Sequence, residues 1–221
     1  MPEVVIPFGV DELSGLWDEA PATRAVMALT HGAGNDIRRP FFTGIAAGLV
    51  AEEVSVLRFN LPYMSAGRRA PDRPAVLAAA WRAALDEATR RAGHAPIVAG
   101  GKSLGGRMAS VVAAEDGTSF DAAAVVFFGY PLHAPGRTEK LRDEHLFRVP
   151  VPMLFIEGTA DSLARFDLME DLVSRLGFRA TLHVIKGADH SFRVRGLRRD
   201  DRDIGEELGG VAAKFILDVT G

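Results

Sequence analysis

The alternation of short apolar runs with longer helical patterns constrains the fold of this chain more than any other feature. Several of the runs are apolar at every position, as expected of central strands in a parallel sheet that is covered on both faces. The predicted strands span residues 25–30, 54–59, 97–99, 123–128, 152–157 and 181–185. The segments VVIPF and SGLW near the start predict an opening antiparallel pair. This pattern predicts an α/β fold, with a mostly parallel central sheet and helices on both faces.

Apolar residues at helical spacing fill the gaps between these strands. They predict helices over residues 36–50, 72–92, 103–116 and 163–176, and a last helix that includes residues 208–219. Two irregular stretches, 60–73 and 129–149, each follow a predicted strand. Because ligands of open parallel sheets bind beyond the carboxyl ends of the strands, we expect these stretches to form the pocket walls.

Composition narrows the class of protein. A chain of 221 residues with 48% hydrophobic residues is enough for one domain, and we expect residues 1–221 to form it. The net charge of −3 provides no basic field, so we expect no nucleic-acid partner. The chain has no cysteine, which excludes disulfides, thiolate metal sites and a cysteine nucleophile. It shows no signal-peptide pattern and no apolar run of membrane length, so we expect a cytoplasmic protein without a membrane partner.

The stretch GGKSLGG allows two incompatible interpretations. A phosphate-binding loop requires G-x-x-x-x-G-K-[ST], but Pro96 occupies the position of the first glycine and has no N–H to donate. The residues Gly101, Ser103 and Gly105 fit G-x-S-x-G instead, between an apolar run and a helix start rich in small residues. This strand–turn–helix setting is typical of a nucleophile elbow, so Ser103 is predicted to be a nucleophile rather than a simple helix cap. The role of Lys102 stays open.

A serine hydroxyl needs a histidine base, and the histidine needs an acceptor that holds its tautomer. Asp161 follows the predicted strand 152–157, and His190 follows the predicted strand 181–185. The order Ser103, Asp161, His190 is that of α/β hydrolases, with each residue after a strand and so at one edge of the sheet.

Other residues compete for the acid and base roles. Glu157 is expected within the strand end, Asp167 in the next helix and Asp189 in solvent, while His183 is expected inside a strand. Position in a loop therefore favours Asp161 as the acid over its rivals.

A tight turn, His31-Gly32-Ala33-Gly34, follows the first parallel strand. Its backbone is suited to direct an N–H group at a developing oxyanion, and we assign the donors to the amides of Ala33 and Leu104. His31 itself is expected to brace the loop.

No histidine spacing indicates a metal site, and no cofactor is expected. The cluster RVRGLRRDDRD reads as a solvated charged loop, with the anchoring of an anionic substrate as the alternative.

Several stretches together are similar to one family: LTHGAGND, RFNLPYM, GGKSLGGRMAS, FFGYPLHAPG, VPMLFIEGTAD and GADHSF. On these stretches the chain resembles the α/β-hydrolase superfamily, and within it the small dienelactone-hydrolase-like proteins related to a testis-expressed protein and to a subunit of a histone-acetyltransferase complex. The resemblance implies a minimal α/β-hydrolase fold without a large cap domain. It also implies that Ser103, Asp161 and His190 occupy the positions of the family's triad.

The sequence thus predicts a serine hydrolase that acts on a small carboxylic ester through an acyl-enzyme. Tyr63, Met64, Tyr130 and His133 follow predicted strands and are candidates for substrate binding, with the stiffening of long loops as the alternative. Two other functions stay open: a noncatalytic interaction module, and a thioesterase or peptidase that uses the same triad. A protein partner is not indicated.

Overall fold

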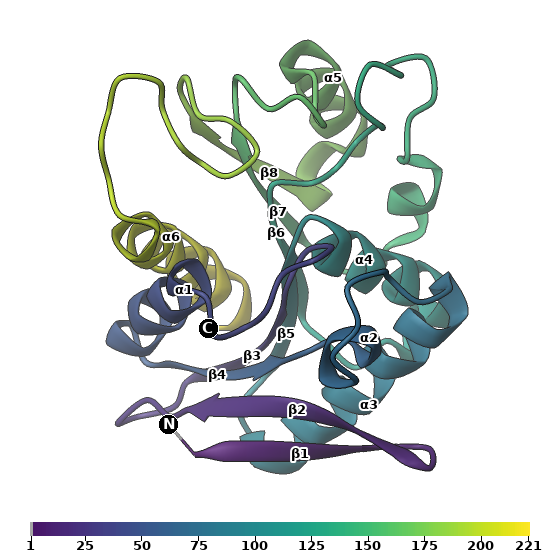
Figure 1. Cartoon of the computed structure of the whole chain (residues 1–221), viewed down its shortest axis with the longest axis vertical. Helices are drawn as coiled ribbons and strands as arrows, with labels where there is room; N and C mark the ends of the chain where they lie inside the picture. Colours follow the sequence, from purple (N-terminus) through teal and green to yellow (C-terminus); the bar gives the residue numbers. More distant parts are fainter. Residues whose placement is uncertain (1) are drawn as a thin grey trace.

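The computed structural model describes residues 2–221, which contain an eight-stranded sheet with the order β1-β2-β4-β3-β5-β6-β7-β8 (Figure 1). The strands are β1 (Glu3–Phe8), β2 (Asp11–Asp18), β3 (Ala25–Thr30), β4 (Val54–Phe59), β5 (Ile97–Lys102), β6 (Ala124–Phe128), β7 (Met153–Gly158) and β8 (Ala180–Ile185). β2 pairs antiparallel with both β1 and β4, and all other neighbours are parallel. The predicted fold class and the predicted opening antiparallel pair are confirmed.

Helices cover both faces of the sheet. The longer ones are α1 (Pro40–Ala51), α3 (Pro74–Ala92), α4 (Leu104–Asp116), α5 (Phe166–Leu176) and α6 (Asp201–Thr220). α1 and α6 pack side by side on one face, while α3, α4 and α5 share a hydrophobic core on the other face (Figure 1). Within the described residues, no helix combines the length and the apolar character that a membrane span requires.

Some helix starts differ from the prediction. α1 begins at Pro40 and α3 at Pro74, because a proline lacks the N–H that the first helical turn leaves unpaired and has φ already fixed near the helical value. Before α1, Asp36 accepts a hydrogen bond from the Arg38 amide over 2.6 Å and holds a turn where helix was expected. α5 begins at Phe166, because Asp161 accepts a hydrogen bond from the Leu163 amide over 2.7 Å and keeps that stretch in a turn.

The irregular stretches are less irregular than expected. The first contains the short helix α2 (Pro62–Ser65), and the second contains a 3₁₀ helix at Glu144–Arg148. Both run beyond the carboxyl ends of parallel strands, as predicted.

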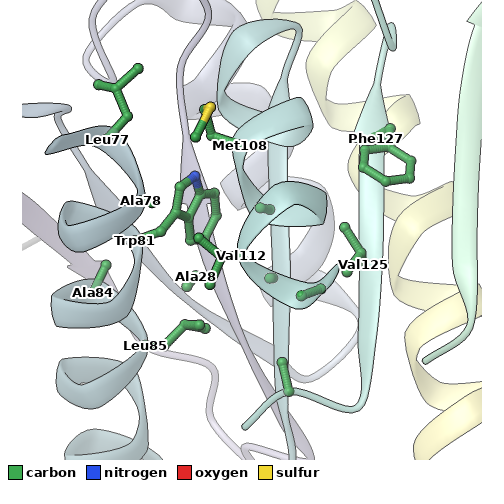
Figure 2. Close-up of a cluster of buried hydrophobic side chains, with 14 of the residues drawn as sticks. Ala28, Leu77, Ala78, Trp81, Ala84, Leu85, Met108, Val112, Val125 and Phe127 are labelled. Carbon is green, nitrogen blue, oxygen red and sulfur yellow. The ribbon is translucent and has the colours of Figure 1, made fainter. Parts of the chain in front are cut away.

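Trp81 is one of the large side chains at the centre of the core on the α3 and α4 side of the sheet (Figure 2). Its ring lies between α3 and α4, near Met108 and Val112, and is fully buried. Its Nε1–H donates a hydrogen bond to the carbonyl of Gly105 over 3.0 Å. The core side chain therefore also holds the first turn of α4 in place.

On the other face, α1 and α6 touch backbone to backbone. A methyl group at Gly205 of α6 would overlap the carbonyl oxygen of Phe41 in α1, and one at Gly44 would overlap the carbonyl oxygen of Arg202. Only glycine allows this approach, so the two helices are held at a short, fixed separation.

Candidate active site

Ser103 occupies the turn between β5 and α4, with φ 51° and ψ −115°. This left-handed backbone region is unfavourable for a residue with a side chain, and it occurs where the surroundings impose it. A Cβ at Gly101 would lie 2.6 Å from the Gly106 nitrogen, and one at Gly105 would lie 2.5 Å from the His31 carbonyl. Glycine is therefore required on both sides of Ser103, as the elbow prediction expects.

Ser103, His190 and Asp161 form a hydrogen-bonded chain. His190 Nε2 lies 3.0 Å from Ser103 Oγ, and His190 Nδ1 lies 2.6 Å from Asp161 Oδ2. Because the carboxylate accepts from Nδ1–H, the Nε2 lone pair faces the serine hydroxyl. The second oxygen of Asp161 accepts the Leu163 amide, which fixes the carboxylate in its loop. The structure thus brings together the three residues that sequence order had singled out.

The rival residues are engaged elsewhere. Asp167 lies in α5 and pairs with Arg165 over 2.7 Å, and His183 lies within β8. Asp189 accepts the amides of Ser191 and Arg193 over 2.8 and 3.0 Å, and so closes the turn that carries His190. Among residues 2–221, Asp161 is the only carboxylate hydrogen-bonded to His190.

The turn after β3 packs directly against the elbow. A Cβ at Gly32 would lie 3.2 Å from Ser103 Cβ. The amides of Ala33, in this turn, and Leu104, at the start of α4, have no acceptor within residues 2–221. Free N–H groups beside a serine at a helix N-terminus are suited to stabilise a developing negative charge.

His31 braces this turn, as expected. Its Nε2 accepts the Leu61 amide over 3.0 Å, and its Nδ1–H donates to the Gly32 carbonyl over 2.8 Å. Burial lowers the pKa of His31, which keeps the ring neutral and suited to accept that hydrogen bond.

Lys102 and Glu157 are two buried ionisable groups close to the triad. The Lys102 Nζ has no hydrogen-bond partner within residues 2–221 and lies 5.2 Å from the centroid of the Phe192 ring. Burial lowers its pKa to about 8, against the opposing charges of Glu157 and Asp161. Burial, together with the charge of Asp161, raises the pKa of the Glu157 carboxyl well above its ordinary value. One of its oxygens accepts the Tyr130 amide.

The substrate-binding role expected for three residues needs correction. Tyr63 donates its hydroxyl to the Gly32 carbonyl, Tyr130 donates to the Arg142 carbonyl over 2.6 Å, and His133 Nε2 accepts the Arg165 amide over 2.9 Å. All three side chains are buried. Their polar atoms pair with backbone groups that long loops leave unpaired, so these residues stiffen the loops. Met64 is half-buried and packs against the core.

Three cavities on the His190 side of the elbow share Arg193, and two of them have a phenylalanine in their walls. The smaller of these two, of about 180 Å³, is lined by Asn35, Phe41, Lys102, Ser191, Arg193 and Asp201. The larger, of about 400 Å³, lies between α6 and the loop that follows His190. Neither cavity is lined by residues 60–73 or 129–149, which were the expected walls.

Sequence reasoning missed these walls because the segment RVRGLRRDDRD was interpreted as solvated. The available signal was Val194 and Leu197, two apolar residues set among the arginines of this segment. As for metals, no group of three ligating side chains within residues 2–221 is arranged to hold an ion.

A mostly parallel sheet of this order, with a strained serine between a central strand and a helix, defines the α/β-hydrolase class. The chain belongs to the α/β-hydrolase family, because the model of the α/β hydrolase domain matches residues 23–216. The resemblance expected from the sequence motifs is thereby confirmed.

Solved structures share the fold over nearly the whole chain. A dienelactone hydrolase from Anabaena variabilis matches with a TM-score of 0.76 and 22% identity, covering 99% of this chain and 97% of that one. Est1E from Butyrivibrio proteoclasticus matches with a TM-score of 0.75 and 13% identity, covering 99% and 98%. A Xanthomonas campestris protein described as an α/β serine hydrolase without lid matches with a TM-score of 0.73 and 19% identity, covering 97% and 94%. The fold is therefore the minimal one expected, without a large cap domain.

Proposed function

We propose that this protein is a serine hydrolase that cleaves a small carboxylic ester. The observation that carries the proposal is the chain of contacts from Asp161 through His190 to Ser103, with 2.6 and 3.0 Å between the bonded atoms. A neutral imidazole with its Nε2 lone pair on a serine hydroxyl is the arrangement that makes the serine nucleophilic.

In the first half of the proposed reaction, Ser103 Oγ attacks the ester carbonyl carbon while its proton passes to His190 Nε2. Asp161 stabilises the imidazolium that results. The amides of Leu104 and Ala33 donate to the oxyanion of the tetrahedral intermediate. The carbon–oxygen bond to the alcohol then breaks, and His190 returns the proton to the leaving alkoxide.

In the second half, water attacks the acyl-serine carbonyl and gives a proton to His190. Collapse of the second tetrahedral intermediate releases the carboxylic acid, and Ser103 Oγ recovers its proton. Every step moves protons through His190 Nε2 alone, so no metal or cofactor is needed.

The comparisons support ester chemistry as the first reaction to test. Among proteins of this fold are a dienelactone hydrolase, an esterase domain from Rhodothermus marinus and an Est1E structure with ferulic acid bound. Thioesters and peptides present the same acyl carbon to the same triad, so they belong in the same panel.

A neutral fluorophosphonate probe tests the proposal directly, because it bonds covalently to a serine oxygen only when that serine is activated. We expect stoichiometric labelling at Ser103 and none in Ser103→Ala. The buried Ser110, whose Oγ lies 2.9 Å from His145 Nε2, provides a matched control, and Ser110→Ala is expected to label as the unaltered protein does. Folded protein that takes up no label and hydrolyses no ester or thioester would contradict the proposal and favour the noncatalytic interaction module.

A further inference from the structure

The larger cavity has an apolar floor beside the catalytic histidine loop. Its floor is made by Ile185, Phe192, Ile204 and Leu208. Leu197 lines the same cavity from the loop, and 63% of its surface is exposed. A volume of about 400 Å³ is within the range of small-molecule sites.

The charges of the residues at the rim of the larger cavity cancel. They are Arg193, Arg198, Arg199, Asp200, Asp203 and Glu207, three of each sign. Arg199 pairs with Glu207 over 2.7 Å, and Arg193 pairs with Asp201 over 2.8 Å. Such a rim attracts neither sign of ligand charge, which favours an uncharged group on the apolar floor over the anionic substrate considered from the sequence.

The two cavities adjoin one another. Arg193 lines both, and Phe192 of the larger cavity stacks on Phe41 of the smaller one with ring centroids 5.9 Å apart. The smaller cavity in turn reaches Lys102 and Ser191, the chain neighbours of Ser103 and His190. Together they extend from the chain neighbours of Ser103 and His190, along the loop after His190, to α6.

The direction of proton transfer decides which half of the substrate lies here. In the proposed mechanism His190 protonates the leaving oxygen, so the alcohol departs on the side of His190. Ser191, Phe192 and Arg193 follow His190 directly in the chain and line the path.

We propose that the two cavities form the leaving-group site, and that the substrate is an ester of an uncharged, apolar alcohol. Leu197, Ile204 and Leu208 are its specificity-determining residues. This inference rests on the hydrolase function proposed above, and it adds the class of alcohol and the residues that select it.

Two series of esters test the inference. In the first, the acyl group is always acetyl and the alcohol is methyl, propyl, hexyl or benzyl. In the second, the alcohol is always methyl and the acyl chain lengthens by the same steps. Because the acetyl group is the same throughout, differences in kcat/KM within the first series report on how the alcohol is bound and released.

We expect kcat/KM to rise along the alcohol series by up to about fourfold for each methylene that becomes fully buried. Leu197→Asp, which places a charge at the cavity, and Leu197→Trp, which fills it, should both flatten this rise without changing the slope of the acyl series. Position 197 is exposed, so both variants are expected to fold. Phe178→Asp is the matched control, since Phe178 is fully exposed and lines neither cavity, and it should change neither series.

Leu208→Ala provides an independent measurement, because it enlarges the floor and should shift the preference toward bulkier alcohols. A flat alcohol series in the unaltered protein, a steep acyl series alone, or an unchanged slope in both Leu197 variants would overturn the inference. In each of these cases Ser103 would still take up the fluorophosphonate label. Loss of labelling and of all turnover would instead overturn the hydrolase function itself.

Discussion

Asp161 and His190 come from loops after neighbouring parallel strands, and a hydrogen bond of 2.6 Å joins the carboxylate to the imidazole. The bond sets the tautomer of His190 and compensates the charge that the ring acquires when it takes a proton. A substitution that removes the negative charge of Asp161 but keeps the shape of its side chain therefore tests the mechanism directly.

Asp161→Asn is expected to fold and to lose about 10³- to 10⁴-fold in kcat, because an amide in this position favours the wrong tautomer of His190. The measurement is kcat for the best ester, together with the rate of fluorophosphonate labelling. Asp167→Asn is the control, since Asp167 is exposed and pairs only with Arg165 in its surroundings, and it should keep full activity. A loss below tenfold in Asp161→Asn would reassign the acid role.

Glu157→Gln is expected to keep the fold and to increase stability at neutral pH. The raised pKa of Glu157 means that the native state retains a proton that the unfolded chain loses above pH 4.5. The carboxyl therefore costs stability progressively as pH rises from that value, and glutamine avoids the cost. Urea unfolding at pH 4 and pH 7 measures the difference, which should grow with pH.

Glu157→Leu separates this effect from packing. It removes the acceptor of the buried Tyr130 amide and should cost about 1 to 3 kcal/mol at either pH. If Glu157→Gln lost as much stability as Glu157→Leu, the carboxyl would be ionised in the native state.

Lys102→Met is expected to raise the free energy of unfolding by about 3 kcal/mol at pH 7, because it removes a buried ammonium that has no hydrogen-bond partner in the described chain. Below pH 8 the native and unfolded states both carry the proton, so the penalty is complete. Between pH 8 and 10.5 the native state loses the proton first, and the gain should shrink over this range. Lys214→Met on the exposed side of α6 should change stability by less than about 0.5 kcal/mol.

Gly205→Ala is expected to destabilise the protein by about 1 to 3 kcal/mol, since the new methyl group meets the Phe41 carbonyl with no room to shift. Gly210→Ala in the same helix is the matched control. Its methyl group would meet nothing within 4 Å, and replacing a helical glycine by alanine should stabilise by up to about 1 kcal/mol. Thermal unfolding of both variants measures the contrast, and equal effects would exclude the close helix contact.

The sequence predicted two features best: the positions of the buried strands, and the triad residues that follow those strands. The predicted strands 25–30 and 54–59 match β3 and β4. Short runs that are apolar at nearly every position are typical of strands buried on both faces of a parallel sheet. The meeting of Ser103 with His190 follows from topology, since the carboxyl ends of parallel strands share one edge.

The sequence pattern did not predict whether a loop side chain points into the core or toward a ligand. Tyr63, Tyr130 and His133 stand in the expected loops, but their polar atoms turn inward to backbone groups. Their partners lie far along the chain, so local pattern does not indicate them. The cavities beside α6 depend in the same way on the distance between a loop and a helix, which no short segment encodes.

The backbone contact between α1 and α6 also bears on how the proposed site would work. Phe41 at the start of α1 and Asp201 at the start of α6 both line the smaller cavity, and the glycine contact between their helices fixes the separation of the two helices. A cavity between helices of fixed separation has its shape before a ligand binds, so binding would cost little conformational entropy of the protein. In the proposed hydrolase, substrates would then be distinguished by how well they fit a cavity whose shape is already set.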